Sequence, residues 1–131
     1  MRYMLMMNAP SKTGDWQVNS WTPEDFNAHI AFMHQYNKEL TDAGELVDAQ
    51  GLSMPHDAKL VKAGSDGKPV TDGVFPESKE FLAGYWIVEV DSPDRAYALA
   101  AKASAAPGRG GKPLNMPIEV RQIMCGPPSD A

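Results

Sequence analysis

The chain has 131 residues, and 12 Lys and Arg against 17 Asp and Glu give it a formal net charge of −5 at neutral pH. A domain of this size buries roughly 70% of the surface of its unfolded chain, so it needs no disulfide, and the single Cys125 could form none internally. Because the chain is acidic, we do not expect it to bind nucleic acid directly. No apolar run reaches the roughly 20 residues of a membrane span, so we predict a cytoplasmic protein without membrane contact.

The first third of the chain predicts a strand followed by a helix. Residues 2–8 form an apolar run of strand length, and a loop follows it. Thr22 and Pro23, followed by two acidic residues, have the pattern of a helix start. Gly44 is typical of a residue that ends a helix, so we expect the helix to continue to about residue 43.

The remainder predicts three more strands, a hairpin and a second helix. Residues 45–52 and 118–124 read as strands, and residues 84–91 have the β-branched and aromatic composition of a central strand. Residues 60–71 predict an inserted hairpin that turns at an Asp-Gly pair. Ser92 is the expected cap of the second helix, whose narrow stripe of small residues would pack closely on a sheet: Ala96, Leu99, Ala100 and Ala103.

This order of elements predicts one α+β domain built from two split βαβ units. The domain should span residues 1–126, and residues 127–131 form a tail that we expect to fray. Its core would be a four-stranded antiparallel sheet with both helices on one face, which leaves the other face of the sheet open.

The open face is expected to combine apolar and charged side chains. Strand alternation directs Trp86, Val88 and Val90 to the helices and assigns the following residues to the open face: Leu46, Asp48, Gln50, Tyr85, Ile87, Glu89, Glu119 and Arg121. Soluble monomers avoid such apolar patches, so we predict a homodimer with stacked sheets. Arg121 would then pair with Glu89 or hold a ligand carboxylate, and an ordinary salt bridge within the sheet is the alternative.

Histidine is the usual residue for acid-base chemistry at neutral pH. His29 falls inside the apolar stripe expected for the first helix (Phe26, Ile30, Met33 and Leu40), whereas His34 falls near its edge. The two are five residues apart and cannot share a metal on one helical face, so no metal site and no cofactor are predicted. His29 is either a half-buried core histidine or a cavity base oriented by Asp48.

The most distinctive stretch is residues 72–85, DGVFPESKEFLAGY. It resembles the DGPF signature of the YCII-related family, DGPFxExKE followed by a Gly-aromatic strand, with Val74 and Pro76 as departures. The resemblance continues through residues 87–92 and 118–121, so it covers nearly the whole domain.

The resemblance implies a ferredoxin-like fold of the dimeric α/β-barrel group. The family includes a cofactor-independent dehydrochlorinase and proteins with a proposed His-Asp pair, and DGPF members are often linked to extracytoplasmic-function sigma factors. The histidine of that pair falls at or next to Met33 here, and Asp48 matches its aspartate only approximately.

Two functions are therefore expected as alternatives. The first is binding of a small anionic molecule between the open face and the loop of residues 72–80, with cofactor-independent proton-transfer or elimination chemistry. Asp48, His29 or Glu77 would act as the base, and the ligand would contact these residues: Arg121, Lys79, Asp72, Tyr85 and Glu89. The second is a non-catalytic regulatory module associated with a sigma factor.

Overall fold

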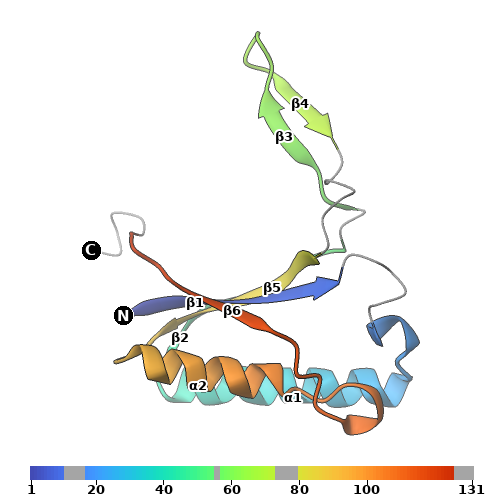
Figure 1. Cartoon of the computed structure of the whole chain (residues 1–131), viewed down its shortest axis with the longest axis vertical. Helices are drawn as coiled ribbons and strands as arrows, with labels where there is room; N and C mark the ends of the chain where they lie inside the picture. The colour runs from blue at the N-terminus through green and yellow to red at the C-terminus, as the bar shows by residue number, and fades with distance from the viewer. Residues whose placement is uncertain (11–16, 55–56, 73–79, 126–131) are drawn as a thin grey trace.

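The computed structural model describes residues 1–10, 17–54, 57–72 and 80–125 (Figure 1). The elements are, in chain order, β1 (Arg2–Pro10), the 3-10 helix η2 (Gln17–Ser20), α1 (Pro23–Asp42), β2 (Leu46–Gly51), β3 (Leu60–Ala63), β4 (Pro69–Asp72), β5 (Glu80–Glu89), α2 (Pro93–Ser104), the 3-10 helix η4 (Arg109–Gly111) and β6 (Ile118–Gln122). Within the described part of the chain, no helix combines the length and apolar character needed to cross a bilayer.

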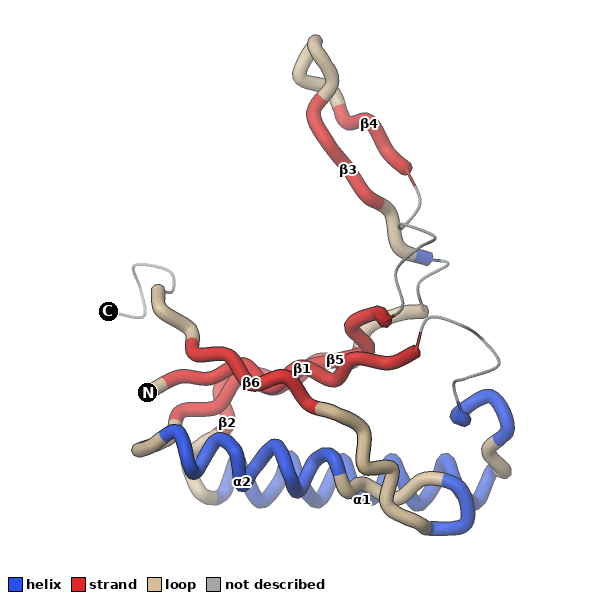
Figure 2. The backbone as a smooth tube through the Cα atoms, viewed as in Figure 1, coloured by secondary structure: helices blue, strands red, loops and turns tan. Residues whose placement is uncertain are grey.

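The four long strands form one antiparallel sheet in the order β2-β5-β1-β6. Both helices cover one face of this sheet, and β3 and β4 form a separate hairpin that stands away on the other side (Figures 1 and 2). The predicted α+β architecture, a ferredoxin-like sheet with two helices on one face and an inserted hairpin, is thereby confirmed.

Local capping explains where α1 begins and ends. The Thr22 hydroxyl accepts from the backbone N–H of Asp25 at 3.2 Å, and the Asp25 carboxylate accepts from the N–H of Thr22 at 3.1 Å. This reciprocal pair is a capping box, and Pro23 occupies the first turn. The helix stops before Gly44, whose φ of +72° only glycine adopts readily. The predicted boundaries of α1 are confirmed.

The core lies between the sheet and the two helices. Leu5 and Val88 are completely buried in the central strands β1 and β5. All four residues of the stripe predicted for α2 are buried as well. Tyr36 of α1 is 2% exposed, and its hydroxyl donates to the carbonyl oxygen of Leu99 at 2.8 Å, which joins the two helices.

The buried face of α1 differs from the predicted stripe. Phe26 and Ile30 are 40% and 49% exposed, so their assignment to the core is wrong. The residues of α1 that face the core are Phe32, Met33, Tyr36 and Leu40. The centre of this observed face lies roughly 60° around the helix from the centre of the predicted stripe, since successive residues advance by about 100°. The two agree better when Tyr36 is counted as an apolar residue. A tyrosine with a satisfied hydroxyl is a good core residue, and this rotation brings His29 to the middle of the inward face.

A β-bulge changes which β2 residues share a face. Leu46 lies opposite Val88 and Asp48 opposite Ile87, so Val47 is an extra residue between them. Leu46 therefore packs against the helix-side core instead of joining Asp48 on the open face as predicted. Asp48 stays on the open face, and Ala49 packs against the core.

The sheet also differs from the prediction in strand length. β5 begins at Glu80, four residues before the predicted start, because β1 extends to Pro10 and Pro10 pairs with Glu80. β6 ends at Gln122 instead of residue 124.

Candidate functional site

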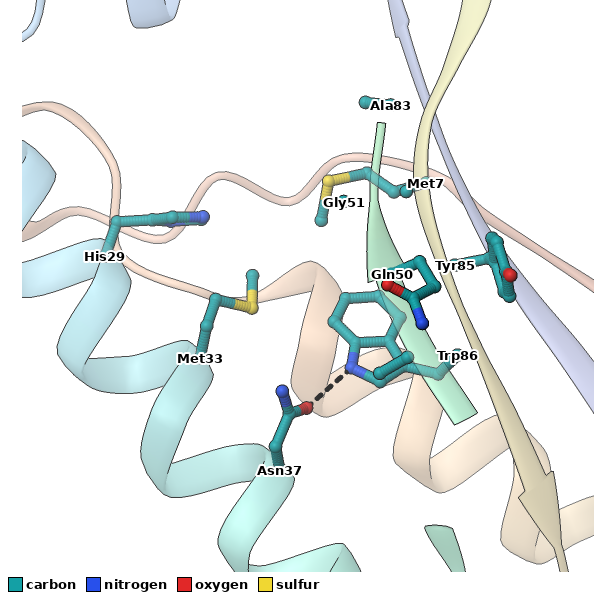
Figure 3. A pocket seen from close by; sticks show the side chains of 11 residues that line it. Met7, His29, Met33, Asn37, Gln50, Gly51, Ala83, Tyr85 and Trp86 are labelled. Carbon is teal, nitrogen blue, oxygen red and sulfur yellow. Dashed lines mark hydrogen bonds between the residues drawn. The ribbon is translucent and has the colours of Figure 1, made fainter. Parts of the chain in front are cut away.

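A cavity of about 290 Å³ lies between α1 and the sheet, beside the end of β2 and the first half of β5 (Figure 3). Side chains of α1 form one wall, and strands β1, β2 and β5 form the other. The lining residues are Met7, His29, Met33, Asn37, Ala49, Gln50, Gly51, Ala83, Gly84, Tyr85 and Trp86.

Trp86 and two methionines give the cavity apolar walls. The indole N–H of Trp86 donates to Oδ1 of Asn37 at 2.8 Å, and the ring of Tyr36 packs edge-on against the indole at 5.4 Å between centroids. The thioethers of Met7 and Met33 lie on the His29 side of the indole (Figure 3). The indole is therefore fixed by two neighbours on α1, while flexible methionines border the remaining space.

His29 projects into the cavity from α1 (Figure 3). Its Nδ1 lies 3.0 Å from the carbonyl oxygen of Pro107, and its ring packs against Trp21 with centroids 5.0 Å apart. A carbonyl can only accept, so Nδ1 carries the hydrogen and Nε2 of the neutral ring is the acceptor. Nε2 has no hydrogen-bond partner among residues 1–10, 17–54, 57–72 and 80–125. The contact with Pro107 thus selects the tautomer in which Nε2 can take a proton.

The loop that carries Pro107 is tied to the start of α1. The backbone N–H of Gly110 donates to Oδ1 of Asp25 at 3.0 Å, and Arg109 binds the hydroxyl of Ser20. Asp25 is buried, with 8% exposure, and serves at once as capping residue and as acceptor for this loop. It therefore helps to hold the Pro107 carbonyl next to His29.

Asp25 should make stability depend on acidic pH. Its pKa is lowered chiefly by the hydrogen bond from the Thr22 N–H; desolvation opposes this and the Gly110 N–H reinforces it. Because the folded pKa lies below the unfolded value near 3.8, the carboxylate contributes stability above that value and loses it as pH falls through the folded pKa. Asp25→Asn should therefore unfold at a lower urea concentration than wild type at neutral pH, and the gap should narrow on acidification.

The matched control for that titration is Asp42→Asn, an exposed aspartate at the other end of α1 that pairs with Lys38. Its effect should be small throughout, as for other exposed ion pairs. An Asp25→Asn variant with a constant stability deficit from neutral to strongly acidic pH would contradict the assignment.

Asp48 lies on the opposite face of the sheet from His29. Its carboxylate accepts from Gln50 Nε2 at 3.0 Å and from the Tyr85 hydroxyl at 3.3 Å. Burial, followed by the charge of Asp48 and this hydrogen bond, raises the pKa of Tyr85. The Tyr85 ring and the Trp86 indole extend from opposite sides of β5 (Figure 3). The alternative in which Asp48 orients His29 is therefore not realised, because the two side chains lie on opposite faces of the sheet.

Within one copy of the chain, Arg121 and Glu89 do not pair. Glu89 binds the N-terminal amine at 3.3 Å and Arg2 at 3.2 Å, whereas Arg121 lies 3.8 Å from Glu119. The reason is strand order: β1 lies between β5, which carries Glu89, and β6, which carries Arg121.

Other predicted site residues belong to the loop of residues 72–80. Glu77 and Lys79 lie outside the described residues, and Asp72 is the last residue of β4. Their roles, and a ligand site between this loop and the open face, stay predictions.

Sequence reasoning missed Asn37, Trp86, Met7 and Met33 as cavity residues. A usable signal was present on α1, where His29, Met33 and Asn37 follow each other at intervals of four and therefore share one face. The signal is weak because the same spacing describes any buried helix stripe.

Gly84 permits the close approach of β2 and β5 at the cavity. A Cβ at this position would lie 2.9 Å from the carbonyl oxygen of Gln50, so the strands would have to separate. Gly84→Ala should lower the free energy of unfolding by about 1–3 kcal/mol, measured by urea denaturation. Gly51→Ala is the control, since Gly51 pairs with Gly84 but a Cβ there meets nothing within 4 Å. Equal losses in both variants would contradict the steric explanation.

A metal centre is not indicated within the described residues, where no three His, Cys, Asp or Glu side chains gather closely enough to hold an ion. A search of curated proteins returned no match. The family model of the YCII-related domain matches residues 1–109, which include α1, the cavity-forming strands and Pro107. With a match over this much of its length, on a ferredoxin-like α+β fold, the chain belongs to the YCII-related domain family.

Proposed function

We propose that this protein binds a small organic molecule in the cavity beneath the sheet and that His29 accepts a proton from it without a cofactor. The observation that carries the proposal is the 3.0 Å contact between Nδ1 of His29 and the Pro107 carbonyl, which leaves Nε2 as the acceptor. The same ring borders a cavity of about 290 Å³, so this acceptor lies beside a space that a ligand can occupy.

The surroundings of His29 suit this role. When Nε2 takes a proton, the ring becomes an imidazolium, and its Nδ1–H bond to the carbonyl of Pro107 becomes charge-assisted and stronger. The side chains of Met7, Met33 and Trp86 offer apolar contact to the body of a ligand, while His29 borders the same cavity as a proton acceptor. His29 replaces the His29–Asp48 pair as the proposed centre of the chemistry.

The test uses 4-nitrophenol, whose ionised form absorbs at longer wavelength than its neutral form. The wild-type protein, at a pH where the free probe is mostly neutral, should bind it and increase the ionised band. His29→Gln keeps a polar side chain but removes the base, and should lower the affinity at least about tenfold and abolish the band. The control is His34→Gln, because His34 is exposed on the same helix. Equal spectra for His29→Gln and wild type would refute the proposal.

We also propose that a second copy covers the open face of the sheet. The strand register places the side chains of this face in rows across the sheet. One row contains Arg121, Met4, Ile87 and Asp48, the next contains Glu119, Met6, Tyr85 and Gln50, and Arg2 lies opposite Glu89. The centre of each long row is apolar, and its ends are polar.

This pattern is self-complementary. A two-fold axis parallel to the strands, between β1 and β5, would stack β6 over β2 of the second copy and β1 over its β5. Arg121 would then face Asp48 of the second copy, and Arg2 would face Glu89, so opposite charges meet while the apolar centres cover each other. This charge complementarity supports a homodimer as the partner of the open face.

A further inference from the structure

Asn37 presents a fixed donor to the cavity. Its Oδ1 is occupied by the indole N–H of Trp86 at 2.8 Å, which determines the orientation of the amide. The Nδ2 group must then lie on the other side, and Figure 3 shows it turned away from the indole, toward Met33. Among the residues that the structure describes, Nδ2 has no hydrogen-bond partner. The cavity therefore contains one oriented donor, Asn37 Nδ2, and one oriented acceptor, His29 Nε2.

The spacing of this pair limits the ligand. His29 and Asn37 are eight residues apart on α1, so their Cα atoms are separated by about 12 Å along the helix axis. Met33 lies between them on the same face of the helix, so a ligand that reaches both groups must carry its acceptor and its acidic hydrogen at opposite ends.

The walls limit its charge and shape. None of the side chains that line the described cavity is a Lys, Arg, Asp or Glu, so a full charge on the ligand would find no counter-ion there. The indole of Trp86 offers a flat apolar surface, and about 290 Å³ holds a single ring with substituents. The sequence had instead suggested an anionic ligand.

We infer that the cavity selects an uncharged, flat, conjugated carbonyl compound whose acidic hydrogen lies at the end opposite the carbonyl. This inference rests on the proposed function. In the step, the O–H or C–H bond of the ligand breaks and its proton forms the new N–H bond at Nε2 of His29. The electron pair left behind delocalises through the conjugated system to the carbonyl oxygen, where Asn37 Nδ2 donates to the developing negative charge. The proton returns from His29 to the ligand, so no oxidant, reductant or metal is needed.

The test compares four single-ring probes by calorimetry and absorbance. 4-Hydroxybenzaldehyde carries its two groups at opposite ends of a conjugated ring, and 3-hydroxybenzaldehyde does not. 4-Hydroxybenzoate carries a charge in place of the aldehyde. 4-Nitrophenol, whose nitro group can also accept from Asn37, reports proton transfer to His29 through its ionised band. The wild-type protein should bind the para aldehyde about ten- to hundredfold more tightly than the meta isomer or the carboxylate, with a shift to the ionised band.

The key variant is Asn37→Asp, which keeps an acceptor for Trp86 but cannot donate to the ligand. It should lose at least about tenfold in affinity for the para aldehyde, while Asn27→Asp, which adds the same charge at an exposed position of α1, should behave as wild type. If Asn37→Asp does not fold, the para, meta and carboxylate comparison on the wild-type protein decides.

The outcomes separate the two proposals. The inferred ligand class would be overturned by equal affinity for the para and meta aldehydes, or by tighter binding of the carboxylate. If 4-nitrophenol still bound in a way that depends on His29, the proposed role of His29 would stand. Failure of every probe to bind, or binding that is unaffected by His29→Gln, would overturn the proposed function itself.

Discussion

Replacing Leu5 with alanine is expected to lower the free energy of unfolding by about 3–5 kcal/mol. Leu5 is completely buried in β1, between the paired strands β5 and β6 and above both helices, so the sheet cannot collapse around the lost side chain without disturbing its register. Small domains are typically stable by only about 5–15 kcal/mol, so this one change would remove a large part of the total. Urea denaturation followed by far-UV circular dichroism measures the loss.

Leu60→Ala is the matched control, because Leu60 is also a leucine on a strand but is 38% exposed on the hairpin. Its effect should stay below about 1 kcal/mol, since little apolar surface is withdrawn from water there. A Leu5→Ala loss as small as that of Leu60→Ala would mean that β1 is not the centre of the core.

Replacing Ile87 with lysine is expected to convert the proposed homodimer to a monomer. Ile87 lies in the middle of the open face, beside Met4 of β1 and Asp48 of β2, and a lysine there would bring two ammonium groups into an apolar centre. Association should weaken about a hundredfold or more, which is the effect expected for a central interface residue. Sedimentation velocity over a range of concentrations measures it, with Val61→Lys on the exposed hairpin as the control.

Charge reversal tests the geometry of that dimer. Arg121→Asp and Asp48→Arg should each weaken association, because each places like charges opposite each other across the two-fold axis. The double variant should recover most of the loss, since the opposite charges are restored with their positions exchanged. A wild-type protein that stays monomeric at high concentration would refute the dimer, and a double variant weaker than both single variants would refute this axis.

Elements whose signals are local could be predicted from the sequence. The capping pattern at Thr22 gave the start of α1, and the small-residue stripe of α2 gave its buried face, because both depend on residues within a few positions of one another. The hairpin turn followed from Gly67, which adopts a positive φ of 79°. Each of these signals comes from residues that lie close together in the chain.

The candidate site depends on long-range geometry and could be predicted only in part. His29 was identified, but its partner is a backbone carbonyl 78 residues away, which has no signature in the side-chain pattern. The bulge at Val47 redirected Leu46 without any glycine or proline to mark it. The inward face of α1 was predicted incorrectly because Tyr36 was not counted as a core residue. Its hydroxyl is satisfied by the carbonyl of Leu99, which is distant in the sequence.

Because Pro107 lies far along the chain from His29, the hydrogen bond that defines the tautomer of His29 can form only late in synthesis. The α1 helix and the first strands are synthesised well before the loop that follows α2, and a nascent chain ending before residue 107 lacks the carbonyl that selects the histidine tautomer. Such a chain can contain the walls of the cavity but not a defined base. The protein therefore acquires its proposed proton acceptor only when the loop that carries Pro107 packs against the start of α1.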